Sequence, residues 1–189
     1  MPYEWVRAWA ELAEGCQDMT DKKVLHRDLQ LDNILLFLEP YDEKDNEIAG
    51  KAHHPDQSKF KKVIKLADFG VGCVEAEKEN VTRGSLRHYS PEGHIHKKEY
   101  ISASDVYSLA YLIHEMMHGK RVFGNQIPME ELMKKVAAGE RPAFEVPCFE
   151  EVKEVLNKIW KTEAAERPSF LEASKLLLEA YEKIKNRVQ

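Results

Sequence analysis

The sequence predicts a mainly helical fold that also contains one or two short β-hairpins. Apolar residues recur every three or four positions in several segments, which places them on one face of an α-helix. Two short apolar runs, 34–38 and 63–66, have the length of strands and are bounded by polar residues. A chain of 189 residues is long enough for one such domain with its own core.

The composition is typical of a soluble globular protein, with 43% hydrophobic and 32% charged residues. Net charge is −5 with both signs mixed, which argues against nucleic acid or an anionic membrane as the main partner. No apolar run approaches the ~18 residues of a membrane span, and no signal peptide is evident. The widely spaced Cys16, Cys73 and Cys148 indicate reduced thiols and an intracellular, cytoplasmic location.

The opening segment is predicted to be a helix, because its apolar residues recur at helical spacing. They are Trp5, Trp9, Leu12, Ala13, Cys16 and Met19. A polar stretch, 26–33, then lies between the apolar residues 24–25 and the run 34–38. We expect a loop held between two buried elements, which keeps a carboxylate still and its oxygens accessible. Asp28 and Asn33, five residues apart, suit the two ends of that loop.

The segment 39–62 between the two predicted strands is polar, lacks periodicity and contains Pro and Gly. We expect a long exposed loop. The pair His53-His54 inside it admits either a metal site or a solvated loop. No cysteine or carboxylate pattern accompanies the pair, which favours the loop.

Asp68-Phe69-Gly70 directly follows the second predicted strand. Periodicity is lost from Gly70 to Glu92, where glycine, charged and hydroxyl residues predominate. We therefore expect an irregular segment that ends at Ser90-Pro91-Glu92. The carboxylates of Asp28 and Asp68 and the amide of Asn33 can hold a divalent metal and orient a hydroxyl.

The clearest helix begins near residue 102, where Ser102 or Ser104 can cap it, and Gly119 can end it. Its apolar face over three turns comprises Val106, Leu109, Ala110, Ile113, Met116 and Met117. Asp105 lies in its first turn, where a negative charge is favourable in itself.

Three more helices are predicted along the rest of the chain. The first covers 129–138 and ends at Gly139. In the last, Ser169 and Glu172 have the spacing of a capping box. The apolar positions of the second helix are Val152, Val155, Leu156, Ile159 and Trp160. Those of the third are Leu176, Leu177, Ala180 and Ile184.

Scattered histidines raise a zinc hypothesis, since His114 and His118 are i, i+4 neighbours and His94 and His96 stand close together. No carboxylate partners are obvious, so we favour an ordinary structural role for these side chains.

The motifs at 26–33, 68–70 and 90–92, with their spacing, resemble those of a eukaryotic protein kinase. The resemblance is to the C-terminal lobe of that α+β fold and covers nearly all of residues 1–189. It implies a catalytic loop at 26–33 and an activation segment at 68–92. The segment 39–62 is then an insertion, because the family usually makes this connection as a tight hairpin.

The resemblance implies transfer of a phosphoryl group from Mg²⁺-ATP to a protein hydroxyl. Asp28 would accept the proton of that hydroxyl. Asn33 and Asp68 would hold magnesium on the nucleotide phosphates, and Leu35 would lie under the adenine. Arg27 would bind a phosphate on the activation segment.

The same resemblance implies regulatory roles for Thr82, a candidate phosphorylation site, and Ser85, which matches a substrate-positioning hydroxyl residue of serine/threonine kinases. Trp160 and the stretch 166–170 are similar to the tyrosine-kinase-like serine/threonine class. Structural roles are implied for His26, Glu92, Asp105 and Arg167. Of these, Asp105 would accept hydrogen bonds from the catalytic-loop backbone, and Arg167 would pair with Glu92.

Two positions in the catalytic loop depart from the family pattern. Serine/threonine kinases usually carry lysine where this chain has Gln30, and tyrosine kinases carry arginine where it has Asp32. Gln30 is therefore a catalytic-site residue that cannot supply the usual cation. The loss of one charged hydrogen bond costs on the order of 1.5–3 kcal/mol, or roughly ten- to a hundredfold in rate.

No Gly-rich loop, strand lysine or helix glutamate precedes the opening helix, so we expect the N-terminal lobe to be absent from these residues. The first hypothesis is a serine/threonine-type protein kinase that needs such a lobe, from its own chain or a partner protein. The second is a catalytically inactive kinase-like lobe that binds proteins. A third, a structural metal-binding domain, rests only on the histidines.

Overall fold

The computed structural model describes residues 2–40, 60–74, 86–95, 100–124 and 126–188. Its α-helices are α1 (Glu4–Asp21), α3 (Pro91–Ile95), α4 (Ser102–His118), α5 (Met129–Ala137), α6 (Glu150–Ile159) and α7 (Phe170–Val188). Its strands are β1 (Val24–Leu25), β2 (Ile34–Pro40), β3 (Phe60–Leu66) and β4 (Cys73–Val74). The short 3₁₀ helices are η1 (Leu31–Asn33), η3 (Leu86–His88) and η4 (Ala164–Glu166). The predicted mainly helical fold is confirmed.

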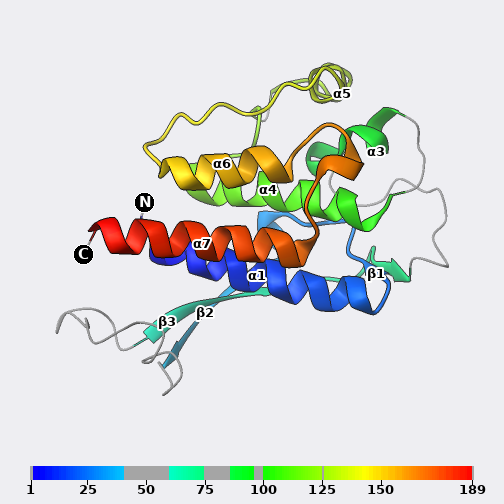
Figure 1. Cartoon of the computed structure of the whole chain (residues 1–189). Coiled ribbons are helices and arrows are strands. Elements are labelled where there is room, and N and C mark those ends of the chain that lie inside the picture. The colour runs from blue at the N-terminus through cyan, green and yellow to red at the C-terminus, as the bar shows by residue number, and fades with distance from the viewer. Residues whose placement is uncertain (1, 41–59, 75–85, 96–99, 125, 189) are drawn as a thin grey trace.

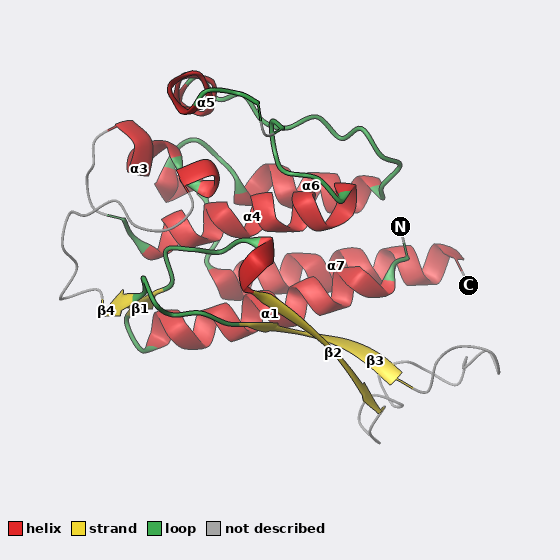
Figure 2. Cartoon of the chain, turned by 180° about the vertical axis from the view of Figure 1, so that it is seen from behind, coloured by secondary structure: helices red, strands yellow, loops and turns green. Residues whose placement is uncertain are grey.

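The long helices form the body of the molecule. Helices α1 and α7 lie side by side, α6 packs on α7, and α4 packs on α6 (Figure 1). The β2–β3 pair extends from the α1 side, and α3 and α5 contact each other on the opposite side (Figure 2). The catalytic loop therefore runs between the α1 layer and α4.

Two small antiparallel sheets flank the catalytic loop. In one, β1 pairs with β4, with Leu25 opposite Cys73. In the other, β2 pairs with β3 from Ile34 opposite Leu66 to Pro40 opposite Phe60. Both strands run further than the sequence predicts, so the ends of the expected loop 39–62 are strand. The rest of that insertion, with His53-His54, lies outside the described residues.

The predicted helix ends are largely confirmed. Gly119 ends α4 in the left-handed conformation, with φ of 63°, and donates its N–H to the Glu115 carbonyl. Ser169 and Glu172 form the expected capping box at α7, with the Ser169 N–H 2.7 Å from the Glu172 carboxylate.

The start of α4 differs from the expectation in part. Ser102 does not cap it, because Ser102 is already its first residue and its hydroxyl lies 3.1 Å from that of Thr20. Ile101 is the N-cap residue, and the Ser104 hydroxyl accepts its N–H at 3.2 Å.

Helix α4 is the centre of the core. Residues from Ser104 to Glu115 are all buried, and the hydroxyls of Tyr107 and Tyr111 lie 2.7 Å apart inside it. The cysteines at 16, 73 and 148, all within the described part, are free thiols. Among the described residues, no helix is long and apolar enough to span a membrane.

Candidate active site

The catalytic loop connects β1 to β2 and is attached to α4 by one carboxylate. Asp105, 1% exposed, accepts the backbone N–H of His26 at 2.8 Å and that of Arg27 at 2.9 Å. Tyr100 donates its hydroxyl to the same carboxylate at 2.7 Å. Arg27 has a φ of 66°, which is costly for a non-glycine residue. The bonds to Asp105 hold the loop in this strained form.

Burial has an electrostatic cost at Asp105. It raises the pKa of the Asp105 carboxyl above its ordinary value, although the three hydrogen bonds act to lower it. A carboxylate in such a position is tolerated because three donors, from His26, Arg27 and Tyr100, are directed at its oxygens.

His26 links the loop to the segment after β3. Its Nδ1 accepts the N–H of Asp28 at 3.3 Å, so its Nε2 carries the proton and donates to the Ala67 carbonyl at 3.2 Å. Its ring also meets Phe69 edge-on, with 4.8 Å between centroids. His26 thus ties the candidate base Asp28 to the residues that precede Asp68.

Two amide side chains hold the carboxylate of Asp28. Asn33 donates through Nδ2 to Asp28 Oδ2 and to the Asp28 carbonyl, both at 2.8 Å. Gln30 donates through Nε2 to the same Oδ2 at 2.9 Å. The structure thus brings three predicted site residues into contact. Because Asn33 uses its nitrogen on Asp28, its amide oxygen faces the other way.

Asp68 is placed next to Asn33 by the backbone. The Ala67 N–H donates to the Asn33 carbonyl at 2.9 Å, one residue before Asp68. Asp68 has a φ of 61°, and its Oδ1 accepts the Gly70 N–H at 2.9 Å. A Cβ at Gly70 would lie 2.9 Å from that same Oδ1, so a larger residue there would displace the Asp68 carboxylate.

The neighbouring surface is apolar and exposed. Leu35 on β2, expected under the adenine, is 47% exposed, and Phe69 is 50% exposed. The next residues of β2, Leu36, Phe37 and Leu38, are exposed as well. This surface is available to a ligand or to another protein segment.

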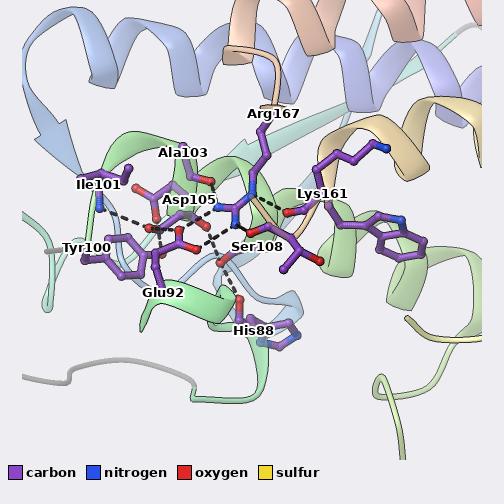
Figure 3. A network of polar contacts seen from close by, with 12 residues as sticks. His88, Glu92, Tyr100, Ile101, Ala103, Asp105, Ser108, Lys161 and Arg167 are labelled. Carbon is purple, nitrogen blue, oxygen red and sulfur yellow. Dashed lines mark hydrogen bonds and ion pairs between the residues drawn. The ribbon is translucent and has the colours of Figure 1, made fainter. Parts of the chain in front are cut away.

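A second polar network joins α3 to the loop before α7 (Figure 3). Arg167 binds Glu92 through two parallel contacts, Nη1 to Oε1 at 2.7 Å and Nη2 to Oε2 at 2.8 Å. Ser104 donates its hydroxyl to Glu92 at 2.8 Å. Burial acts to raise the pKa of Glu92, but the hydrogen bond and charge of Arg167, together with the hydrogen bonds from Ser90 and the Glu92 backbone, bring the pKa below its ordinary value.

The residues predicted to regulate the site are only partly described. Arg27 is buried, and its Nε donates to the Val71 carbonyl at 2.7 Å, which connects the loop to the activation segment. Thr82 and Ser85 lie outside the described residues. Near the end of that segment, Arg87 donates to the carbonyls of Gly124 and Ile127.

Two residues that contact the site were missed by the sequence reasoning. Arg121 donates to Gln30 and to Asp32, and Tyr100 donates to Asp105. Tyr100 is five residues before Asp105, but no local pattern marks it. Arg121 is 91 residues from Gln30, and only the fold brings them together.

His114 and His118 have hydrogen-bonding roles. His114 Nε2 donates to the Ala143 carbonyl at 3.0 Å, and burial lowers its pKa to about 4. His118 donates through Nδ1 to the His114 carbonyl and accepts the Glu145 N–H through Nε2. Among the described residues no three His, Cys, Asp or Glu side chains cluster as metal ligands; His96 lies outside them.

The fold and this loop agree with the C-terminal lobe of a protein kinase that the motifs predict. The family model for protein tyrosine and serine/threonine kinases matches residues 2–177, so the chain belongs to that family. The resemblance stated from the motifs is therefore confirmed.

Similar curated proteins are serine/threonine kinases. The chain is 31% identical to the serine/threonine-protein kinase VIK of Arabidopsis thaliana over 86% of its own length and 33% of that protein. It is 28% identical to the Arabidopsis serine/threonine-protein kinase STY17 over 88% of the chain and 26% of the relative. Mitogen-activated protein kinase kinase kinase 7 of Drosophila melanogaster is 26% identical over 88% of the chain and 21% of that protein. The chain spans a third or less of these relatives.

Proposed function

We propose that this chain is the catalytic lobe of a serine/threonine-type protein kinase that transfers the terminal phosphoryl group of ATP to a protein hydroxyl. The observation that carries the proposal is the Asp28 carboxylate, held by Asn33 and Gln30 on a loop anchored to Asp105. Phosphoryl transfer depends on positioning and charge more than on covalent chemistry, and this arrangement supplies positioning.

Asp28 is the proposed base. Its carboxylate is held through Oδ2 by two amide donors, so its direction toward a substrate hydroxyl is fixed. As the oxygen of that hydroxyl attacks the phosphorus, its proton passes to the Asp28 carboxylate. The bond to the leaving oxygen of the nucleotide breaks, and that oxygen departs with the nucleoside diphosphate.

The donor set fits magnesium. Mg²⁺ takes oxygen ligands, and the Asp68 carboxylate and the Asn33 amide oxygen are of that kind. Asn33 directs its nitrogen to Asp28, which leaves the oxygen for a cation. When bound with ATP, the metal neutralises charge on the phosphates. Leu35, half exposed at the start of β2, is the proposed apolar contact under the adenine.

Regulation by phosphorylation of Thr82 is a further part of the proposal. Arg27 lies beside Asp28 and already binds the activation segment at Val71. A phosphate on Thr82 would add a charge-assisted contact to Arg27 and order the segment, while Ser85 would position the substrate. Thr82→Ala should abolish activation by phosphorylation in a chain completed with an N-terminal lobe. Unchanged activity and unchanged amide protection of the segment would contradict it.

The decisive test adds an N-terminal lobe to this chain, so that the nucleotide cleft is complete. The 189 residues, joined to the N-terminal lobe of a serine/threonine relative, are incubated with labelled ATP and a generic protein substrate. Transfer is expected, and Asp28→Asn should lower it by about 10²- to 10⁴-fold. Asp18→Asn, an exposed change on α1, is the matched control and should have no effect. The same residues without the added lobe should transfer negligibly, because water is not excluded from the site.

A protein-binding role without catalysis is the second candidate. It is favoured by β2, whose Leu36, Phe37 and Leu38 are 52%, 41% and 64% exposed. This role predicts that the completed chain shows no transfer, whereas Leu38→Glu abolishes association with a binding protein. Transfer that depends on Asp28 would exclude it.

A further inference from the structure

Arg121 connects the segment after α4 to the catalytic loop. Its Nη1 donates to Gln30 Oε1 at 3.2 Å, and its Nη2 donates to Asp32 Oδ2 at 2.8 Å. Gln30 in turn donates through Nε2 to Asp28 Oδ2 at 2.9 Å. A chain of hydrogen bonds therefore runs from Arg121 through Gln30 to the proposed base.

The direction of this chain is set by chemistry. A guanidinium group only donates hydrogen bonds, so Arg121 binds the oxygen end of the Gln30 amide. An ionised carboxylate only accepts, so Asp28 takes the nitrogen end. In the flipped orientation two donors would face each other, and an amide oxygen would face the carboxylate. Arg121 thus selects the one orientation of Gln30 that stabilises Asp28.

The backbone that carries Arg121 is fixed on both sides. Before it, Gly119 ends α4. After it, Val122 is buried and donates its N–H to the Glu115 carboxylate at 2.9 Å. The Gly124 N–H donates to the Arg121 carbonyl at 3.1 Å. The guanidinium therefore extends from a rigid base, as a positioning group requires.

We propose that Arg121 is a positioning residue for phosphoryl transfer, acting on Asp28 through Gln30. The inference rests on the proposed function and deepens it. The Arg121 and Asp32 side chains are 31% and 68% exposed, so solvent screens their charges. Asp32 also neutralises the guanidinium. Arg121 therefore acts through the orientation of Gln30 and does not replace the usual lysine as a free cation.

The first test needs no activity. In the 189-residue chain, the side-chain amide of Gln30 is observed by ¹⁵N nuclear magnetic resonance. It should be ordered in the wild type and mobile in Arg121→Met. Lys120→Met is the matched control: it removes the neighbouring cation, which pairs with Glu145, and should leave the Gln30 amide unchanged. An unchanged Gln30 amide in folded Arg121→Met would overturn the inference. Should that variant fail to fold, Arg121→Ala, which also removes the donor to Gln30, must loosen the amide, and a wild-type Gln30 signal there overturns the inference.

The second test measures transfer in the chain completed with an N-terminal lobe. Arg121→Met should lower kcat by about three- to tenfold with the KM for ATP unchanged, the effect of one lost hydrogen bond in the transition state. Arg121→Lys should lower kcat less than Arg121→Met does, because one donor to Gln30 remains. Wild-type kcat in Arg121→Met would refute the positioning role. A completed wild-type chain without transfer would refute the proposed function, while the amide measurement would still decide the link from Arg121 to Gln30.

Discussion

Arg167 and Glu92, 75 positions apart in the sequence, form a bidentate ion pair with contacts of 2.7 and 2.8 Å. Arg167 also donates to the carbonyls of Ala103, Lys161 and Thr162. One guanidinium therefore joins α3, the start of α4 and the loop before α7 (Figure 3). The end of the activation segment is attached to the helical body at this point.

Replacing Arg167 by Met should destabilise the fold strongly. It strands the Glu92 carboxylate and removes the donor to three backbone carbonyls. Breaking a buried pair costs roughly 3–5 kcal/mol, and the lower end is expected because the Glu92 side chain is 23% exposed. Urea denaturation measures the change. Arg187→Met, which breaks a pair with Glu151 in which the Arg187 side chain is 58% exposed, is the control and should have a much smaller effect. Equal effects of the two substitutions would contradict the structure.

The same pair should make stability depend on acid pH. The pKa of Glu92 is lower in the folded chain than its ordinary value of 4.5. As the pH falls below that value, the unfolded chain binds the proton first, so the stability contributed by Glu92 decreases. Unfolding free energies of the wild type and Arg167→Met, measured from pH 6 down to pH 3, should therefore converge. A constant difference across this range would show that Glu92 is not stabilised by Arg167.

Asp105→Asn should loosen the catalytic loop. An amide has a single acceptor oxygen, whereas Asp105 accepts from the backbone of His26 and Arg27 and from Tyr100. At least one backbone N–H loses its acceptor, and Arg27 loses support for its positive φ. Hydrogen exchange at the His26 and Arg27 amides should accelerate. Asp32→Asn, at an exposed site on the same loop, should leave these two amides protected. Unchanged exchange in Asp105→Asn would refute the anchoring role.

Restoring the usual lysine should depend on Arg121. In the completed chain, Gln30→Lys brings a cation to the transferred phosphate but also places it beside the guanidinium of Arg121. A lysine side chain only donates hydrogen bonds, so in Gln30→Lys it meets the donors of Arg121 with no acceptor between them, and the double substitution Gln30→Lys/Arg121→Met should transfer faster than Gln30→Lys alone. With Gln30 present, by contrast, Arg121→Met should lower kcat relative to the wild type. A double-mutant cycle in kcat measures this reversal of sign. If Arg121→Met had the same effect in both backgrounds, the two residues would be uncoupled.

The local elements of this protein were predictable from sequence because their causes are local. Helical periodicity located α1 and α4–α7, the capping box at Ser169 and Glu172 marked the start of α7, and Gly119 marked the end of α4. The motifs around Asp28 and Asp68 predicted the family, which the family model confirmed. Strand ends were less predictable, because β2 and β3 continue into polar residues as long as each strand has a partner.

The sequence by itself determined the fold class, the family and the residue types at the catalytic loop. Only the tertiary structure decided which side chains control one another there. Arg121 reaches Gln30 across 91 positions, and Tyr100 joins the anchor at Asp105. Ser102 contacts Thr20, 82 positions away, and does not cap α4. The physical reason is that a side-chain hydrogen bond depends on a separation of about 3 Å, which is set by how distant elements pack and not by local spacing.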